Sequence, residues 1–168
     1  RTEVFFWAFC DDYLELIKQR RYGAEGEAAA ASATRAMQAA ISVMLRLFAP
    51  FLPFVTDEVW SWWRDGSVHR AAWPAASEIR LLIGEASPDA AAAFTLASAV
   101  TAKLRQQRST NKKSFKVPMR ATVTLDDAQR PLLGRVQQDI ISGNNLVGLV
   151  AQPGAALDVS VEFVEAEG

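Results

Sequence analysis

Few side chains of this 168-residue sequence could perform acid–base or nucleophilic chemistry. The adjacent Asp11 and Asp12 would be the carboxylate pair of such a site. Consecutive residues of a helix point about 100° apart, however, so the two carboxylates would not face one substrate. We therefore expect one aspartate to face solvent and the other to form a local salt bridge.

The only histidine, His69, and the only cysteine, Cys10, also lack partners that would activate them. His69 has no obvious nucleophile or orienting group beside it, so we expect a loop histidine with a polar contact. Cys10 lies among aromatic residues and is expected to be a small buried hydrophobic side chain. One histidine and one cysteine are too few ligands for zinc. We predict no catalytic residue, no metal site and, without a glycine-rich phosphate loop, no cofactor in this segment.

Basic residues, in contrast, are concentrated in one stretch. The net charge of the whole sequence is −1, yet no Asp or Glu lies between Lys103 and Arg120. Such a cluster is typical of a surface that binds phosphate groups, although a solvated helix face and a mobile loop would give the same pattern. The cations that we select as phosphate-binding candidates are Lys103, Arg105, Arg108, Lys112, Lys113 and Lys116.

The composition is that of a globular protein of one domain, or of one domain with a small appendage. Half of the residues are hydrophobic and 22% are charged, which places the sequence outside the disordered class. No apolar stretch of about 18 residues predicts a membrane-spanning helix. A single cysteine suits a reducing compartment, so we expect a cytoplasmic protein without a membrane partner.

The hydrophobic pattern predicts mainly α-helix. Helical periodicity predicts a first helix at residues 3–20 and a second at 28–48. A third helix is expected to begin at an N-cap at Thr56, and a fourth covers residues 90–107. Alternating apolar residues predict strands at 119–125, 146–150 and 157–164, with a helix at 126–141. We divide the chain into a helical bundle portion (1–75), a connector broken by Gly84 and Pro88 (76–89), and a basic helix with a small α+β element (90–168).

Aromatic residues gather where the second helix ends near Pro50. We expect Phe48, Phe51, Phe54 and Trp60 to fill this corner of the bundle. Of the tryptophans that follow, Trp62 and Trp63 are candidates for stacking on nucleic-acid bases, although aromatic residues at such positions more often belong to the core.

Three segments, in this order, carry a resemblance to a known family. They are FFWAFCDDYLELIK (5–18), LRLFAPFLPFVTDEVW (45–60) and GSVHRAAWP (66–74). They resemble the C-terminal region of class I aminoacyl-tRNA synthetases of the valyl type, closely over residues 1–74 and more loosely over residues 90–165. The sequence stops at Gly168 after an acidic tail without heptads, whereas many members of the family end in a basic coiled-coil arm.

The resemblance implies a helical bundle of the class Ia anticodon-binding type with a small C-terminal α+β element. It implies that this segment holds the anticodon stem-loop of a tRNA, with Lys and Arg on phosphates. ATP-dependent joining of valine to tRNA, and editing, would lie in upstream domains of the same chain, which we expect to be a monomer. The alternative is a non-catalytic helical module that binds protein partners through its aromatic corner.

Overall fold

The computed structural model describes residues 2–84 and 87–164. Residue 1 of the predicted bundle, residues 85–86 of the predicted connector and residues 165–168 of the predicted α+β element lie outside the described residues.

The chain begins with an almost continuous helical stretch. It comprises α1 (Thr2–Trp7), a π-helical segment η1 (Ala8–Tyr13), α2 (Leu14–Leu16) and α3 (Lys18–Arg21). Gly23 and Gly26, both at positive φ, then turn the chain into the long helix α4 (Glu27–Phe48). The helices predicted at residues 3–20 and 28–48 are confirmed.

The corner after α4 differs from the prediction. Helix α5 (Pro53–Ser61) begins with a proline in its first turn, where the missing N–H costs nothing. Thr56 is therefore inside the helix, and its hydroxyl donates to the Leu52 carbonyl at 2.8 Å instead of capping the N-terminus. A short 3-10 turn, η2 (Val68–Arg70), closes the corner.

The aromatic residues of this corner are divided between core and solvent. Trp60 is buried in a small cluster with Leu45, Ala49 and Val68. Phe51 and Phe54 are exposed, Phe54 at 89%, so the expectation that they fill the corner is wrong. The earlier start of α5 explains the exposure of Phe54. Thr56 and Trp60 share the inward face of the helix, and Phe54 lies on the opposite face.

The predicted connector contains a helix, α6 (Ala76–Ile83). A two-pronged ion pair attaches it to α4: Arg46 donates to the Glu78 carboxylate at 2.7 and 2.9 Å. The same guanidinium donates to the Ser42 carbonyl and to the Ala72 carbonyl, so buried Arg46 joins α4, the loop and α6. The order in this segment comes from a contact 32 residues apart, which local periodicity does not reveal.

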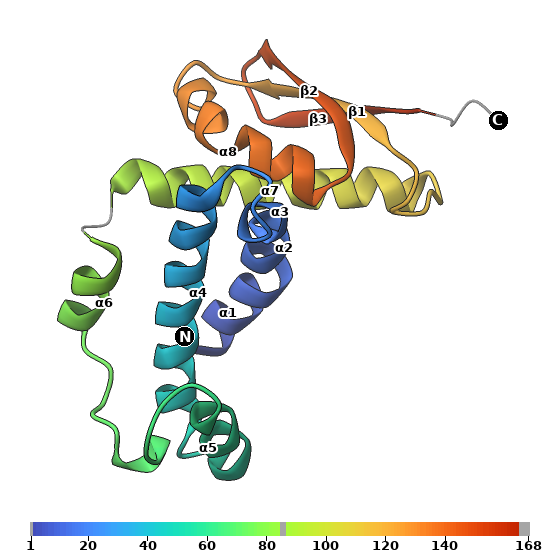
Figure 1. Ribbon diagram of the computed structural model, residues 1–168. Helices are drawn as coiled ribbons and strands as arrows, with labels where there is room; N and C mark the ends of the chain where they lie inside the picture. The colour runs from blue at the N-terminus through green and yellow to red at the C-terminus, as the bar shows by residue number, and fades with distance from the viewer. Residues whose placement is uncertain (1, 85–86, 165–168) are drawn as a thin grey trace.

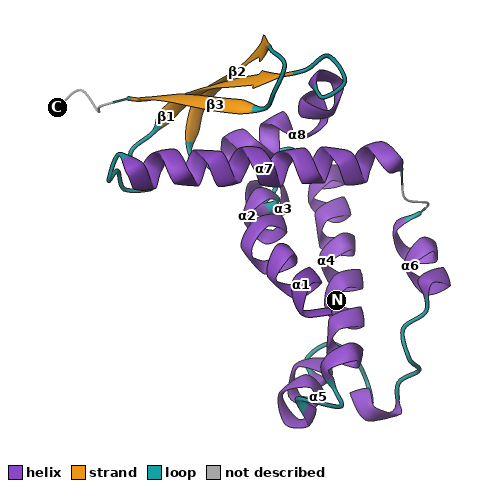
Figure 2. Ribbon diagram, turned by 180° about the vertical axis from the view of Figure 1, so that it is seen from behind, coloured by secondary structure: helices purple, strands orange, loops and turns teal. Residues whose placement is uncertain are grey.

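Helix α7 (Pro88–Thr110) supports the C-terminal part of the chain (Figure 1). Strand β1 (Met119–Leu125) is central in a three-stranded sheet of order β2-β1-β3. It pairs in parallel with β2 (Leu146–Pro153), across α8 (Arg130–Gly143), and antiparallel with β3 (Asp158–Phe163). Helices α7 and α8 cover one face of the sheet, as the two views agree (Figures 1 and 2). The mainly α class with a small C-terminal α+β element is confirmed.

The main core lies between α7, α8 and the sheet. Val100, Leu104, Val123 and Ile140 are all fully buried there. Leu16 of α2 belongs to the same core, so the first helices pack against the C-terminal part across α7 and α8. Figure 2 shows α4 and α1–α3 on the side of α7 that faces away from the sheet.

Candidate nucleic-acid interface

The basic stretch predicted from the sequence forms the end of α7 and the loop that follows it (Figure 1). We call residues 111–118 the basic loop. It starts with a Schellman-type ending: the Lys112 N–H donates to the Ser109 carbonyl at 3.1 Å and the Lys113 N–H to the Arg108 carbonyl at 3.0 Å. Lys112 occupies the left-handed position of this motif, with φ of 51°, where glycine or asparagine is usual.

Arg108 has a different position from that expected of a phosphate-binding cation. It is only 7% exposed, and its guanidinium donates to the carbonyls of Ser114, Val117 and Asn144 at 3.0, 2.6 and 2.8 Å. Burial lowers the pKa of this guanidinium, although arginine keeps its charge at neutral pH. Arg108 therefore acts inside the protein, where it ties the basic loop to the end of α8.

Two of the other predicted cations are paired with acids from elsewhere in the fold. Arg105 donates to the Asp12 carboxylate at 3.0 Å and to the Asp11 carbonyl at 2.7 Å. Lys103 lies 3.7 Å from the Asp158 carboxylate at the start of β3. The absence of acids between Lys103 and Arg120 in the sequence thus hides a partial neutralisation in three dimensions.

The remaining lysines belong to the basic loop itself. Lys112, Lys113 and Lys116 are all exposed, and the Lys113 ammonium lies 6.0 Å from the centre of the Phe163 ring. Within residues 2–84 and 87–164, no carboxylate comes within ion-pair distance of Lys112 or Lys116. Phosphate binding by these side chains stays a prediction. Lys112 and Lys116 lie in the basic loop, whereas the candidate cations of α7 are paired with acids or buried.

The candidate stacking residues lie far from these cations. Trp62 and Trp63 follow α5, at the end of α4 opposite to α7 (Figure 1). Helix α4 has 22 residues, so its length alone separates the two places by about 30 Å. Trp62 is 70% exposed and donates from its indole N–H to Glu58 at 3.1 Å. Trp63 packs against the corner cluster, with the Arg64 guanidinium 4.9 Å from its ring centre.

Among the candidates for acid–base chemistry, His69 is placed as predicted, whereas the salt bridge of the aspartates is not local and Cys10 is only partly buried. Asp12 forms the ion pair with Arg105, and Asp11 is exposed. His69 Nε2 lies 3.2 Å from the Pro53 carbonyl, which is the polar contact expected of a loop histidine. Burial and the neighbouring Asp11 raise the pKa of the partly buried Cys10 thiol, which makes it a poorer nucleophile.

Sequence reasoning missed Asp57, which fixes the loop that carries His69. Its carboxylate accepts from the Ser67 hydroxyl at 2.6 Å and from the Val68 N–H at 2.9 Å. These two hydrogen bonds hold the pKa of Asp57 below its usual range. The residue has a structural role in the corner, and no sequence signal linked it to Ser67.

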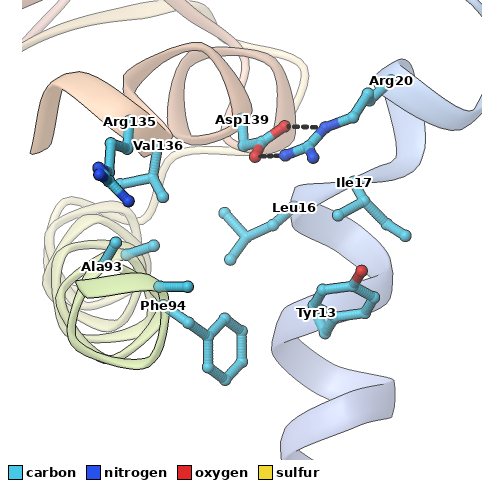
Figure 3. A pocket seen from close by; sticks show the side chains of 11 residues that line it. Tyr13, Leu16, Ile17, Arg20, Ala93, Phe94, Arg135, Val136 and Asp139 are labelled. Atoms are coloured by element: carbon cyan, nitrogen blue, oxygen red, sulfur yellow. Dashed lines mark hydrogen bonds and ion pairs between the residues drawn. The ribbon is translucent and has the colours of Figure 1, made fainter. Parts of the chain in front are cut away.

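A cavity of about 300 Å³ lies between the first helices, α7 and α8 (Figure 3). Arg20 and Asp139 form an ion pair at its rim, with Arg20 Nε 3.1 Å from one carboxylate oxygen. Tyr13, Leu16 and Phe94 line its apolar side. Arg135, which also lines the cavity, lies 3.5 Å from the Asp89 carboxylate, so the charged side chains named at this cavity are paired.

The described residues contain no group of three or more His, Cys, Asp or Glu side chains that could hold a metal ion. Within the same ranges no helix is long and apolar enough to cross a membrane. The described residues present a helical support that carries an exposed basic loop.

An exposed loop with several lysines on a helical bundle offers a surface suited to phosphate groups. The family model of the anticodon-binding domain of tRNA ligase matches residues 1–124. The chain belongs to this family.

Bacterial valine–tRNA ligases are among the relatives of the chain. The chain is similar to the valine–tRNA ligase of Thermobifida fusca, with 45% identity over 170 residues, which is 99% of this chain and 19% of that protein. It is 54% identical to the valine–tRNA ligase of Cutibacterium acnes over 123 residues, which is 72% of this chain and 13% of that protein. The chain thus spans less than a fifth of the length of these relatives.

Proposed function

We propose that this chain binds the anticodon stem-loop of a tRNA as part of a valine–tRNA ligase. The observation that carries the proposal is the match of the anticodon-binding family model to residues 1–124, a range that includes the whole basic loop. The identity to valine–tRNA ligases supports valine as the amino acid and cytoplasmic protein synthesis as the setting. ATP and the activation of valine would belong to other domains of the complete enzyme, which would act as a monomer.

The proposed mechanism is positioning without chemistry. Lysines of the basic loop, chiefly Lys112 and Lys116, would contact backbone phosphates, where each contact releases counterions. Lys103 and Arg105 would add to the field while they remain paired with Asp158 and Asp12. The corner with Trp62 would touch a different part of the tRNA, because the length of α4 separates it from the loop.

The predicted division into residues 1–75, 76–89 and 90–168 is also carried forward as a proposal. The attachment of α6 to α4 through Arg46 and Glu78 supports assigning the first part of the connector to the bundle.

Binding of a valine-specific tRNA transcript to the chain at several salt concentrations tests the proposed function. We expect the affinity to fall steeply as salt rises, and the Lys112→Gln/Lys116→Gln variant to lower the salt slope by about two charges. Arg130→Gln, in an exposed pair at the first residue of α8 and outside the basic loop, is the charge control. Equal affinity and salt slope for the wild type and the loop variant would contradict the phosphate assignment.

The alternative of a protein-interaction module gains no support from the names of these relatives. The exposed Phe51 and Phe54 could contact a protein partner at the corner. Their acidic neighbours Asp57 and Glu58 disfavour this, because charged residues are depleted at the centre of protein interfaces. An electrophoretic shift with tRNA separates the two functions directly.

A further inference from the structure

The basic loop carries an aromatic side chain that the sequence reasoning did not select. Phe115 lies between Lys113 and Lys116 and is 58% exposed, although burying such a ring is favourable by about 2 kcal/mol. One exposed aromatic residue alone would need no explanation. Here it lies at the tip of a loop whose other prominent side chains are lysines.

The backbone on both sides of Phe115 is fixed. The Asn145 side-chain amide donates to the Phe115 carbonyl at 3.0 Å and to the Lys116 carbonyl at 3.3 Å. Asn145 is itself in the left-handed region, with φ of 52°. Arg108 donates to the carbonyls of Ser114 and Val117, the residues that flank this pair. The loop is therefore organised before any ligand binds.

The ring is also supported from one side. The Arg108 guanidinium carbon lies 5.2 Å from the centre of the Phe115 ring, which is a cation–π distance. A ring that packs on a buried guanidinium and is 58% exposed can serve as a flat platform. Unpaired nucleic-acid bases stack on such rings, and neighbouring lysines attract the phosphates on either side of the base.

We propose that Phe115 is a stacking platform for one unpaired base of the bound RNA, with Lys112 and Lys116 on the adjacent phosphates. The proposal rests on the proposed tRNA-binding function and names the contact made by the loop. Arg108 and Asn145 are positioning residues, because their side chains donate to carbonyls of the loop and Arg108 also supports the ring.

Equilibrium binding of a valine-specific tRNA transcript to the full chain tests this contact. Phe115→Ala and Phe115→Leu are each expected to weaken binding about 10-fold without changing the salt slope, since stacking does not release counterions. Phe115→Trp should stay within about twofold of the wild type, because it keeps a flat ring. Tyr22→Ala, at another exposed aromatic residue outside the basic loop, is the matched control and should bind like the wild type.

Several outcomes would overturn the proposal. Wild-type affinity in Phe115→Ala, or in Phe115→Leu, would mean that no base stacks on the ring. If Lys112→Gln/Lys116→Gln still weakens binding in that case, the phosphate assignment survives and only the stacking fails. If the wild type binds no tRNA, both proposals fall. Binding to phosphatidylserine vesicles that is lost in Phe115→Ala, with tRNA binding unaltered, would assign the loop to a membrane surface instead.

Discussion

At the scale of single residues, Lys112 combines a structural cost with an exposed charge. A residue other than glycine in the left-handed backbone region lowers the stability of the folded chain by about 1 kcal/mol. Lys112→Gly should therefore raise the free energy of unfolding of the chain by roughly 0.5–1 kcal/mol, as measured in urea, while it weakens tRNA binding. Lys116→Gly, in the same loop, should give no such stabilisation. Lower stability in Lys112→Gly would argue against the strain.

The contrast between Lys112 and Arg108 shows how far single residues could be predicted. Both belong to one run of cations, and both lie beyond the helix predicted at residues 90–107, whereas α7 continues to Thr110. The difference arises because Arg108 lies on the inward face of α7, four residues after Leu104, and finds three carbonyls there. Two of those carbonyls belong to the basic loop and one to Asn144, so the burial of Arg108 depends on the folded loop and on α8.

At the scale of elements, the close approach of α8 to α2 depends on one glycine. A Cβ at Gly143 would lie 3.0 Å from the Glu15 carbonyl oxygen and 3.2 Å from the Leu16 Cα, so two backbones would have to separate. Gly134, earlier in α8, has nothing within 4 Å of such a Cβ. We expect Gly134→Ala to stabilise the chain by about 0.5–1 kcal/mol and Gly143→Ala to destabilise it by about 1–3 kcal/mol. Thermal unfolding of the two variants checks both signs, and stabilisation by both would exclude the close contact.

The attachment of α6 to α4 should depend on pH. Hydrogen bonds from Arg46 hold the pKa of Glu78 below its usual 4.5. A lowered carboxylate pKa contributes stability that is complete above pH 4.5 and is lost as pH falls through the folded value. Glu78→Gln should cost about 1 kcal/mol at pH 7, a small value because the Glu78 side chain is partly exposed.

Urea unfolding of wild type and Glu78→Gln from pH 7 to pH 3 measures this contribution. The difference between the two should shrink below pH 4.5, when the wild-type carboxyl is protonated as well. Glu15→Gln, in an exposed pair with Lys18, is the control and should stay within about 0.5 kcal/mol of the wild type. A difference between Glu78→Gln and wild type that does not change with pH would rule out the ion pair as its source.

Elements with a clear hydrophobic period were predictable, and elements held by distant contacts were not. The period-two alternation of β1 gives alternate burial at Met119, Ala121, Val123 and Leu125. Helix α6 follows two loop segments and ends at Gly84, and it is anchored by Arg46 from another helix. The exposure of Phe54 was missed because the N-cap of α5 is Leu52, four residues before the predicted Thr56, which places Phe54 inside the helix on the face away from Thr56 and Trp60. Phe51 lies in the turn before α5.

At the scale of the whole molecule, we propose two units, the helices before α6 and the part formed by α7, α8 and the sheet, which meet where α2 and α3 contact α8. All five tryptophans precede α6: Trp7 lies in α1, Trp60 in α5, and the other three between α5 and α6. The sheet and α8 contain no tryptophan. Figure 3 shows the point of contact, where Arg20 of α3 pairs with Asp139 of α8 at the rim of an apolar cavity. No sequence pattern connects two residues 119 positions apart, so this coupling could be found only in three dimensions.

The Arg20–Asp139 pair should make the two units unfold together. Asp139 is buried and Arg20 is partly exposed, so Arg20→Met leaves a buried carboxylate without its partner and should cost about 3 kcal/mol. Asp139→Leu should cost less, and the double variant should cost at least about 1 kcal/mol less than the sum of the two. Arg135→Met, in an exposed pair at the same cavity, is the control and should cost under about 0.5 kcal/mol.

Tryptophan fluorescence reports the helical unit and circular dichroism reports the whole chain, so the two urea transitions should coincide in the wild type and separate in Arg20→Met. Additive single variants with coincident transitions would mean that apolar packing around Leu16 joins the units without help from the ion pair.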